Sequence, residues 1–309
     1  MTDLEQYILD EWTEDYREGR VARREFLRRI VVFSGGAAAG LAVLKGLGVS
    51  AGMEEVAAAA SAPPPLRAQA TGITVSPTDP AIDARMVSFP SGGTTVLAYL
   101  ALPRGKAKAA GVSVVHENRG LLEHHKDVTR RLAKAGYAAL AADLASPAGG
   151  TDKVADGAEV ASQLAHTPPE QLVGMLNAGV QYLQGLPTVR GDMQGTVGFC
   201  FGGGLVWRLA EQNAGLRAAV PFYGPNPPLQ DVPNIKAAVL AFYGSLDTFV
   251  NPGIASMRQA LDAAKVTYEM HIYDGAAHAF FNDTGASYNA AAAKDAWART
   301  LNWMGRWLE

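Results

Sequence analysis

From about residue 72 onward, short apolar runs alternate with segments whose apolar residues recur every three or four positions. The apolar runs predict strands at residues 94–103, 109–117, 137–144, 194–199, 216–224, 237–244 and 266–275. The recurring pattern predicts helices at residues 125–136, 168–186, 203–212 and 291–308. Continuous apolar strands that stop at polar residues are typical of buried parallel sheets. We therefore predict an α/β fold with a mostly parallel central sheet and helices on both faces.

Residues 1–70 have a different pattern and are predicted to form an extension of the main domain, which spans residues 71–309. Apolar side chains at four-residue spacing predict a short amphipathic helix over residues 1–19, through Leu4, Ile8, Trp12 and Tyr16. A basic segment follows, then a weakly apolar run at residues 30–44 and an Ala/Pro-rich stretch at residues 57–72. Basic, apolar and small-residue segments in this order are typical of an export signal.

The segment ARREFLRR at residues 22–29 resembles a twin-arginine signal, in which an Arg pair precedes x-Phe-Leu and a basic residue. This resemblance implies the twin-arginine export machinery as a partner, a periplasmic location, and cleavage after Ala68-Gln69-Ala70. Two other interpretations stay open. One is a membrane helix, although about fifteen apolar residues are short for a span. The other is an amphipathic extension of a cytoplasmic protein, which the acidic residues before the arginines favour.

Charge and cysteine content narrow the function further. The formal net charge of −3 and the lack of a basic stripe interleaved with aromatic residues give no nucleic-acid footprint. The chain has a single cysteine, Cys200, so its fold cannot rest on an intrachain disulfide. A lone cysteine is most often a small buried hydrophobe. The residues around this one indicate chemistry instead.

Cys200 follows a predicted strand and precedes a predicted helix, and Gly198 and Gly202 flank it. Gly-x-Cys-x-Gly is the pattern of a nucleophile elbow with sulfur in place of the serine hydroxyl. The flanking glycines allow a strained turn and close backbone packing. A sulfur at a helix N-terminus is also placed where free amides favour the thiolate. We predict that Cys200 is a catalytic nucleophile.

A thiol nucleophile needs a base, and the base needs an orienting acid. His278 follows the last predicted strand, and Asp247 follows the strand before it, so both fit the chain order nucleophile, acid, histidine. Asp143 also ends a strand, but it precedes Cys200 and fits that order less well. His271 lies within the last strand and is expected to be a face residue, and His166 is expected in a solvated loop.

The segments HENRGL, GFCFGGG, GSLDTFVNP and GAAHAFFN together resemble the dienelactone hydrolase family of α/β-hydrolases, over residues from about 72 to 309. The resemblance implies a Cys200–Asp247–His278 triad. It implies that Glu117 approaches the thiol in the resting enzyme and gives way when substrate binds. It also implies an oxyanion hole formed by the backbone amides of Phe201 and Asn118. We expect a hydrolase of the carboxymethylenebutenolidase type, without cofactor or metal, whose partner is a small ester or lactone.

The sequence departs from this family where the substrate is selected. Members that act on dienelactone hold its carboxylate with two arginines, one after the Asp-Leu strand end and one four residues after the catalytic histidine. Here the first region reads DLASPAGG and the second position is Asn282. An amide cannot replace a bidentate guanidinium. A more apolar ester, lactone or thioester is therefore expected, and Phe199, Phe201, Phe280 and Phe281 favour it.

Two functions from other classes are also compatible with the pattern. The segment HENRGLLEHH could bind a metal ion, although its spacing matches no established ligand set; its donors are His116, Glu117, Glu123, His124 and His125. The chain could instead be a non-catalytic ligand-binding member of the same fold, because a fold alone does not fix function.

Overall fold

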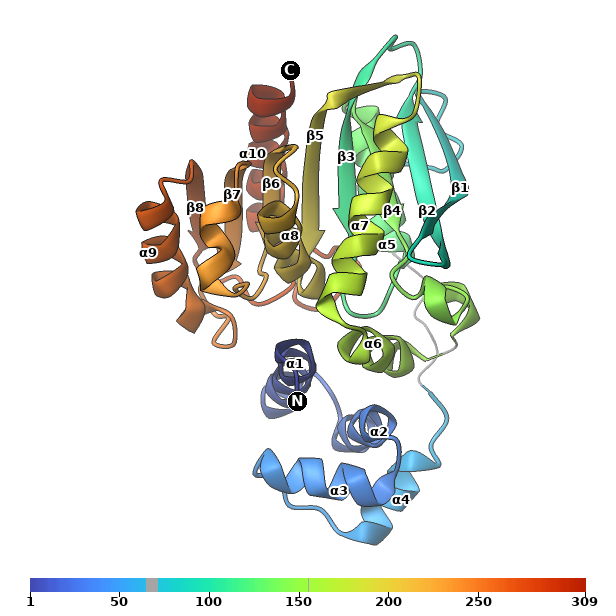
Figure 1. The fold of residues 1–309 in the computed structure, drawn as a ribbon. Helices are drawn as coiled ribbons and strands as arrows, with labels where there is room; N and C mark the ends of the chain where they lie inside the picture. The colour runs from blue at the N-terminus through green and yellow to red at the C-terminus, as the bar shows by residue number, and fades with distance from the viewer. Residues whose placement is uncertain (65–71, 155) are drawn as a thin grey trace.

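A computed structural model describes residues 1–64, 72–154 and 156–309 of the chain. In this described part, one sheet of eight strands lies above a group of N-terminal helices (Figure 1). The strands are β1 (Ile82–Ser91), β2 (Thr94–Pro103), β3 (Ala109–Val115), β4 (Ala138–Ala142), β5 (Val189–Phe199), β6 (Leu216–Phe222), β7 (Ala238–Gly244) and β8 (Tyr268–Tyr273). The α-helices are α1 (Asp3–Arg17), α2 (Arg23–Ser34), α3 (Ala37–Gly46), α4 (Met53–Ala60), α5 (Glu123–Lys134), α6 (Gly157–His166), α7 (Pro169–Gln184), α8 (Phe201–Gln212), α9 (Ile254–Ala264) and α10 (Ala290–Leu308). Short 3₁₀ turns are η1 (Ser146–Ala148), η2 (Thr151–Lys153), η3 (Leu229–Asn234) and η4 (Asn251–Gly253).

The strand order is β1-β2-β4-β3-β5-β6-β7-β8. Strands β1 and β2 pair antiparallel, as do β2 and β4, and every later pair is parallel. Helices α7 and α8 cover one face of the sheet, and α5 and α10 cover the other (Figure 1). Strands β3, β4 and β7 are buried along their whole length, as the continuous apolar runs predicted. The predicted mostly parallel α/β fold is confirmed.

Each of the predicted strands and helices of the main domain is present, and β1, α6 and α9 are additional. Strand β1 is an edge strand that pairs only with β2, among the described strands. Most of its residues are at least partly exposed, and it contains Pro90, so it lacks the apolar run of a buried strand. The exposed His166, expected in a loop, is the last residue of α6.

The N-terminal segment is folded. Helix α1 begins with a capping box between Thr2 and Glu5, and its apolar face is buried, as the four-residue spacing predicted. The basic and weakly apolar segments form α2 and α3, which meet at a bend of 111°. In the described part of the chain no single helix is long and apolar enough to cross a membrane, although α2 and α3 together would be. The predicted cleavage position at Ala68–Ala70 lies outside the described residues.

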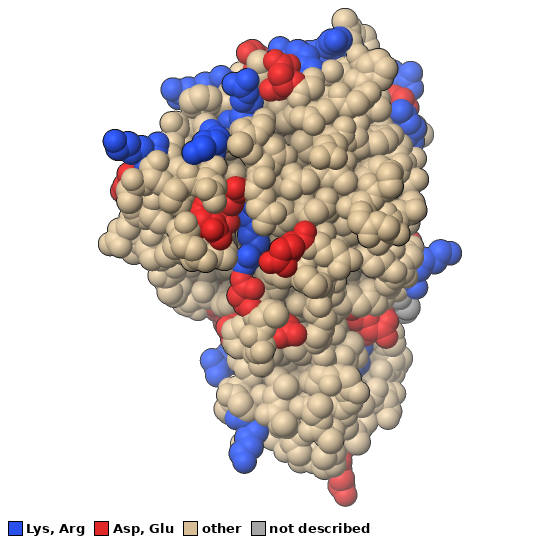
Figure 2. Space-filling view, in the orientation of Figure 1, with Lys and Arg blue, Asp and Glu red and all other residues tan. Residues whose placement is uncertain are grey.

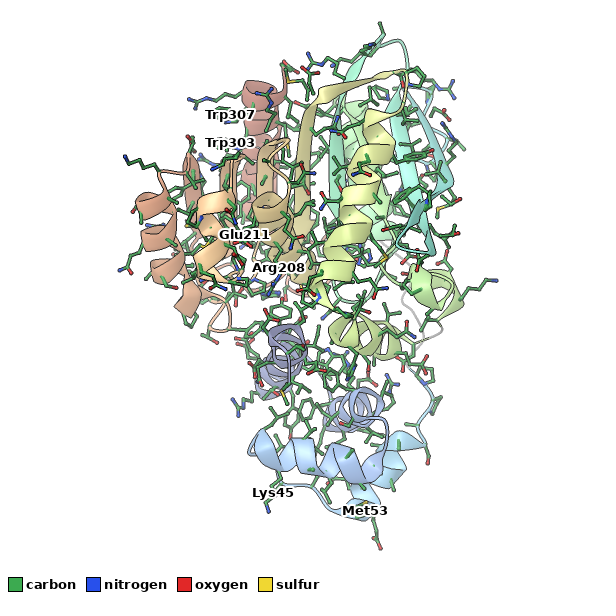
Figure 3. The ribbon with its side chains drawn as sticks, in the orientation of Figure 1. Lys45, Met53, Arg208, Glu211, Trp303 and Trp307 are labelled. Atoms are coloured by element: carbon green, nitrogen blue, oxygen red, sulfur yellow. The ribbon has the colours of Figure 1, made fainter. Side chains whose placement is uncertain are left out.

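Polar contacts join these helices to the main domain at several points. Arg28 on α2 is only 3% exposed and forms a two-pronged ion pair with Asp156, the N-cap of α6, with one N–O distance of 3.0 Å. Glu14 on α1 accepts a hydrogen bond of 2.5 Å from the Thr248 hydroxyl. Asp3 pairs with Arg208, which lies on the side of α8 that faces α1 (Figure 3). The N-terminal helices are thus attached at the end of the sheet where the parallel strands finish.

The buried Arg28–Asp156 pair generates a stability prediction. Arg28→Ala leaves the Asp156 carboxylate buried without its cation, and should lower the free energy of unfolding by about 3 kcal/mol. Denaturant titration followed by circular dichroism measures the change. Arg24→Ala is the matched control, because Arg24 lies on the same helix but is exposed, and its effect should stay within about 0.5 kcal/mol. Equal losses in the two variants would show that this pair does not hold the helices in place.

Candidate active site

Cys200 occupies a sharp turn between β5 and α8. Its backbone has φ 57° and ψ −123°, a strained conformation for a residue with a side chain. The turn is possible because glycines flank it. A Cβ on Gly198 would lie 2.5 Å from the Gly202 carbonyl oxygen, and a Cβ on Gly202 would overlap the carbonyl oxygens of Val115 and His116. The Gly-x-Cys-x-Gly pattern thus has the strand-turn-helix context of a nucleophile elbow.

Asp247 and His278 form a buried pair next to that turn. Asp247 follows β7, and its Oδ1 accepts hydrogen bonds from the backbone amides of Phe249 at 3.2 Å and Val250 at 2.9 Å. Its Oδ2 lies 2.7 Å from Nδ1 of His278, which sits in the loop after β8. This contact fixes the imidazole with Nδ1 directed to the carboxylate. Nε2 of His278 is buried and has no hydrogen-bond partner among the described residues.

The thiol, the imidazole and a third group meet in one small volume. The Cys200 sulfur, a ring nitrogen of His278 and a carboxylate oxygen of Glu11 all lie within 4.8 Å of one another. Sequence analysis predicted the first two as neighbours, and the structure brings them together with Asp247. One thiol, one imidazole and one carboxylate are also donors that a zinc ion accepts, so these three residues are the described ones best placed to hold a metal.

Glu11 and Tyr7 contact the Cys200 sulfur, and sequence analysis did not predict either residue as part of the site. The Tyr7 hydroxyl lies 3.3 Å from the Cys200 sulfur. The thiol donates to Oε2 of Glu11 at 3.6 Å, and the Asn118 side-chain amide donates to the same oxygen at 2.8 Å. These contacts join residues more than a hundred positions apart, and no local pattern in the sequence signals them. The spacing of Tyr7 and Glu11, one helical turn, was the only available hint.

The other candidate residues lie around the same point. Phe201 is the first residue of α8, where a backbone amide has no acceptor within the helix. Asn118 follows Glu117 in the loop after β3. Sequence analysis expected Glu117 beside the thiol. In the structure its Oε2 accepts a hydrogen bond of 2.8 Å from the Asn282 side chain, and Glu11 takes the position on the sulfur.

The remaining polar candidates have structural partners. Asp143 accepts hydrogen bonds from the amide and hydroxyl of Thr151, both at 2.7 Å, and so holds the loop after β4. Among the histidines of the HENRGLLEHH segment, His124 Nδ1 bonds Asp283 at 2.9 Å and His125 Nε2 accepts from the Glu117 amide at 3.2 Å. His116 Nε2 accepts from the Leu144 amide at 3.0 Å. Each of these rings is engaged separately, so the segment does not gather its donors at one point.

Burial controls the protonation of the site. Burial raises the pKa of the Cys200 thiol to about 12, and the nearby Glu11 charge adds to this effect. Burial also raises the pKa of Glu11 to about 7, against smaller opposing effects of His278 and Arg119. Burial alone would lower the pKa of His278, but the charge and hydrogen bond of Asp247 outweigh it and hold that pKa well above its usual range. The helix N-terminus was expected to favour a thiolate; with α1 in place, the sulfur is a neutral thiol.

The phenylalanines expected near the substrate divide into two groups. Phe199, Phe280 and Phe281 are fully buried, and Phe199 stacks on Phe281 with ring centroids 5.2 Å apart. They belong to the core. Phe201 is also buried, but its ring faces Tyr7 of α1 at a centroid distance of 6.3 Å.

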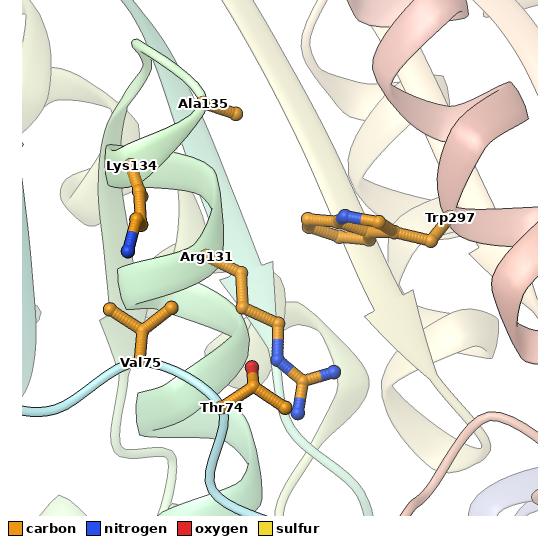
Figure 4. Close-up of a pocket in the computed structure, with 6 residues that line it drawn as sticks. All are labelled: Thr74, Val75, Arg131, Lys134, Ala135 and Trp297. Carbon is orange, nitrogen blue, oxygen red and sulfur yellow. The ribbon is translucent and has the colours of Figure 1, made fainter.

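One hollow in the surface of the molecule lies apart from the candidate active site. A hollow between α5 and α10 is lined by residues that include Arg131 and Trp297, which face each other across it (Figure 4). None of its lining residues is one of the six candidate site residues. Figure 2 shows both Lys and Arg and Asp and Glu side chains on one face of the molecule.

Comparison with known proteins identifies relatives of this chain in sequence and fold. The sequence model of the dienelactone hydrolase family matches residues 96–308. A protein of Salmonella typhimurium named as a carboxymethylenebutenolidase is 36% identical over 74% of this chain and 89% of its own length. A solved structure named as a dienelactone hydrolase, from Klebsiella pneumoniae, is 33% identical with a TM-score of 0.67, covering 73% of this chain and 99% of its own. A dienelactone hydrolase-like promiscuous phosphotriesterase from metagenomic libraries is 29% identical with a TM-score of 0.67, covering 74% and 100%.

The raised pKa of Glu11 predicts how the stability of the protein depends on pH. The folded protein holds the Glu11 proton up to a pKa of about 7, whereas the unfolded chain releases it near 4.5. The wild-type protein should therefore lose stability as pH rises from 4.5 through 7, by up to about 3 kcal/mol. Glu11→Gln stays neutral and avoids this loss. Its melting temperature should match the wild type near pH 4.5 and exceed it at pH 8.

Thermal melts between pH 4.5 and 8.5 provide the measurement, and Glu18→Gln is the control. Glu18 is an exposed carboxyl at the end of the same helix, so this variant should follow the wild-type pH dependence. A difference between Glu11→Gln and the wild type that does not grow with pH would exclude a buried, proton-binding Glu11.

Proposed function

Because this chain belongs to the dienelactone hydrolase family, whose members have an α/β-hydrolase fold, we propose that it cleaves a carboxylic ester or lactone through Cys200, His278 and Asp247. The observation that carries the proposal is the buried pair of Asp247 and His278 at 2.7 Å, with the unpaired Nε2 of the imidazole beside the only thiol of the chain. That is the arrangement of nucleophile, base and orienting acid that acyl transfer needs.

The first half of the reaction forms a thioester. His278 takes the proton of the Cys200 thiol, and the thiolate sulfur forms a bond to the substrate's carbonyl carbon. The carbonyl oxygen becomes an oxyanion, which the backbone amides of Phe201 and Asn118 stabilise. When the oxyanion returns to a carbonyl, the carbon–oxygen bond to the alcohol breaks, and His278 gives its proton to the leaving oxygen. Asp247 stabilises the imidazolium that exists between these two proton transfers.

The second half releases the acid. His278 takes a proton from water, and the water oxygen bonds to the thioester carbon. The carbon–sulfur bond then breaks, and His278 returns the proton to sulfur, which restores the thiol. Asp247 stabilises the imidazolium that His278 becomes in each step in which it accepts a proton.

The side chains of Asn282 and Glu117 indicate which class of substrate the site accepts. Asn282 stands four residues after His278, where family members that act on dienelactone have an arginine, and its amide is already bonded to Glu117. A substrate carboxylate would find no guanidinium at that position. We therefore propose an ester or lactone without a carboxylate at this position as the substrate.

Replacement of the nucleophile tests this function. Cys200→Ala should abolish hydrolysis of p-nitrophenyl acetate, and His278→Ala should reduce it by at least about a hundredfold, because the general base is lost. Intact-mass spectrometry of the wild-type protein should detect an acetyl group on Cys200 during turnover. His271→Ala is the control: His271 lies on β8 and should leave the rate unchanged. Persistent hydrolysis by a folded Cys200→Ala protein would refute the mechanism.

Export by the twin-arginine pathway is a second part of the proposal, carried by the ARREFLRR segment. In the folded chain, Arg24 is exposed and Arg23 pairs with Glu55 at 2.6 Å, whereas Phe26 and Leu27 are buried. An export receptor that reads the whole motif would have to bind α2 before it docks or after it is released.

Localisation in a bacterial host tests export. Arg23→Lys combined with Arg24→Lys should keep the chain in the cytoplasm, because the pathway reads the arginine pair. Arg17→Lys combined with Arg20→Lys makes the same charge-conserving substitutions outside the motif and should leave export intact. Cell fractionation and immunoblotting report both. If the two double variants are found in the same compartments in equal proportions, the arginine pair is not an export signal. The N-terminal helices would then be a part of the mature enzyme only.

A further inference from the structure

Helix α1 covers the candidate nucleophile. Tyr7 projects from it so that its hydroxyl lies 3.3 Å from the Cys200 sulfur, and its ring packs 4.9 Å from the Phe249 ring and 6.3 Å from the Phe201 ring. Tyr7 is itself buried, and Cys200 is only 3% exposed. The sulfur is therefore enclosed by the chain's own N-terminal segment, among residues supplied by the loop after β7 and by α8.

Glu11 fills the other side of the sulfur, one helical turn further along α1. Its Oε2 lies 3.6 Å from the sulfur and 2.8 Å from the side-chain nitrogen of Asn118, the residue whose backbone amide is proposed for the oxyanion hole. A carboxyl oxygen next to both the nucleophile and Asn118 stands where the carboxyl product of hydrolysis would be released.

A substrate has no place in this arrangement. Attack requires the substrate's carbonyl carbon about 3–3.5 Å from the sulfur, in line with the attacking orbital. Two oxygens of α1 already lie 3.3 and 3.6 Å from the sulfur. The contact also keeps the sulfur protonated, because burial and the Glu11 charge raise the thiol pKa to about 12. The docked helix therefore excludes the substrate sterically and keeps the thiol in its protonated, unreactive form.

We propose that α1 occupies the substrate site as an internal ligand, with its Tyr7 phenol and Glu11 carboxyl in place of the two products of a phenolic ester, so that α1 leaves before catalysis and the preferred substrates are aryl esters. This inference rests on the proposed function, because it takes Cys200 as the nucleophile.

The chemistry of the two side chains identifies the substrate class. Hydrolysis of an aryl ester yields one phenol and one carboxylic acid. The thiolate bonds to the acyl carbon, the bond from that carbon to the aryl oxygen breaks, and His278 protonates the phenolate. Water then cleaves the thioester to the acid and restores the thiol. Tyr7 presents a phenol oxygen at the sulfur with its ring against Phe201 and Phe249, which is the position of such a leaving group. Aromatic rings in this setting prefer another aromatic ring.

The attachments of α1 allow it to move without the other helices. Besides the contacts of Tyr7 and Glu11 at the sulfur, α1 meets the main domain near its two ends. Asp3 pairs with Arg208 and Glu5 lies 3.7 Å from His166 near its start, and Glu14 accepts from Thr248 near its end. The deeply buried Arg28–Asp156 pair belongs to α2. Between the two helices, Gly19 has φ 74°, a conformation that glycine adopts freely. Helix α1 also packs on α2, with the Tyr16 ring stacked on Phe26 at 4.6 Å and the Trp12 ring 6.0 Å from Phe33. In the proposed movement α1 leaves these rings and swings on the segment that contains Gly19, while the Arg28–Asp156 pair keeps α2 docked.

Thiol trapping in the full chain tests the movement directly, because Cys200 is the only cysteine. Ile8 is fully buried in the contacts of α1, and Ile8→Asp would place an unpaired charge there, which favours the released helix. Cys200 of the Ile8→Asp variant should react with iodoacetamide at least about tenfold faster than Cys200 of the wild type. Gln6→Asp adds the same charge at an exposed position of α1 and should react at the wild-type rate. Equal rates in all three proteins would overturn the proposal.

A second measurement uses the wild-type chain alone, so it does not depend on how a variant folds. Once iodoacetamide has attached a carboxamidomethyl group to Cys200, that group fills the space of Tyr7 and Glu11, and α1 cannot return. Hydrogen exchange of the α1 amides should then accelerate by at least about tenfold, while the α10 amides keep their protection. Unchanged exchange in α1 after complete alkylation would show that the helix does not occupy the site.

The substrate class is tested by protection of the released site. In Ile8→Asp, 4-methylphenol, which is the side chain of tyrosine, should slow alkylation of Cys200 at least about fivefold, and 4-methylcyclohexanol of similar size should not, because it lacks the aromatic ring. Equal protection by the two alcohols would refute the aryl preference. These readouts follow access to sulfur and not turnover. Hydrolysis that survives Cys200→Ala would therefore disprove the proposed mechanism, whereas trapping that ignores Ile8→Asp would disprove the role of α1.

Discussion

The parallel strands β3, β5, β6, β7 and β8 are neighbours in the sheet and end at one edge, and the sharp backbone turn at Cys200 lies at the centre of that edge. This turn depends on the absence of side chains at Gly198 and Gly202, because a Cβ at either position would meet backbone oxygens. The strain at Cys200 is stable only because buried strands and α8 fix the chain on both sides. Every other group of the candidate site is placed relative to this one turn.

Acyl transfer and the closed arrangement place opposite demands on the sulfur at this edge of the sheet. Acyl transfer requires a sulfur that can lose its proton and an open approach for a carbonyl group. The closed arrangement provides the opposite, since the thiol is buried, neutral and in contact with Tyr7 and Glu11. The Asp247–His278 pair is nevertheless complete under the helix. The proposed catalytic groups are therefore preorganised, and in the proposed open site only the access of substrate and the protonation of sulfur would differ.

The N-terminal helices have a comparable conflict between two uses of one segment. The arginine-rich motif of α2 carries the proposed export signal, but its Phe26 and Leu27 are packed inside and Arg28 is paired with Asp156. An export receptor and the main domain would compete for the same side chains. The Arg28–Asp156 pair holds α2, and α1 has its own contacts with the main domain before Gly19. The two helices also pack on each other through Tyr16 and Phe26, so the proposed release of α1 has to break that contact.

The sequence by itself determined the architecture of the main domain and the identity of the thiol-centred constellation. Continuous apolar runs specify buried strands and glycine spacing specifies the turn at Cys200, because both depend on local backbone geometry and burial. Chain order was enough to select Asp247 over Asp143, which the structure shows holding Thr151 instead. The edge strand β1 escaped prediction because its exposed residues carry no burial pattern.

Only the tertiary structure decided which residues contact the Cys200 sulfur. The pattern of residues 1–19 predicted an amphipathic helix, and α1 is that helix, but periodicity does not say which surface buries its apolar face. Its contact with Cys200 joins positions that are more than 180 residues apart. The contact of Glu11 with the sulfur has the same origin, because no local pattern distinguishes Glu11 from the other carboxylates of the chain.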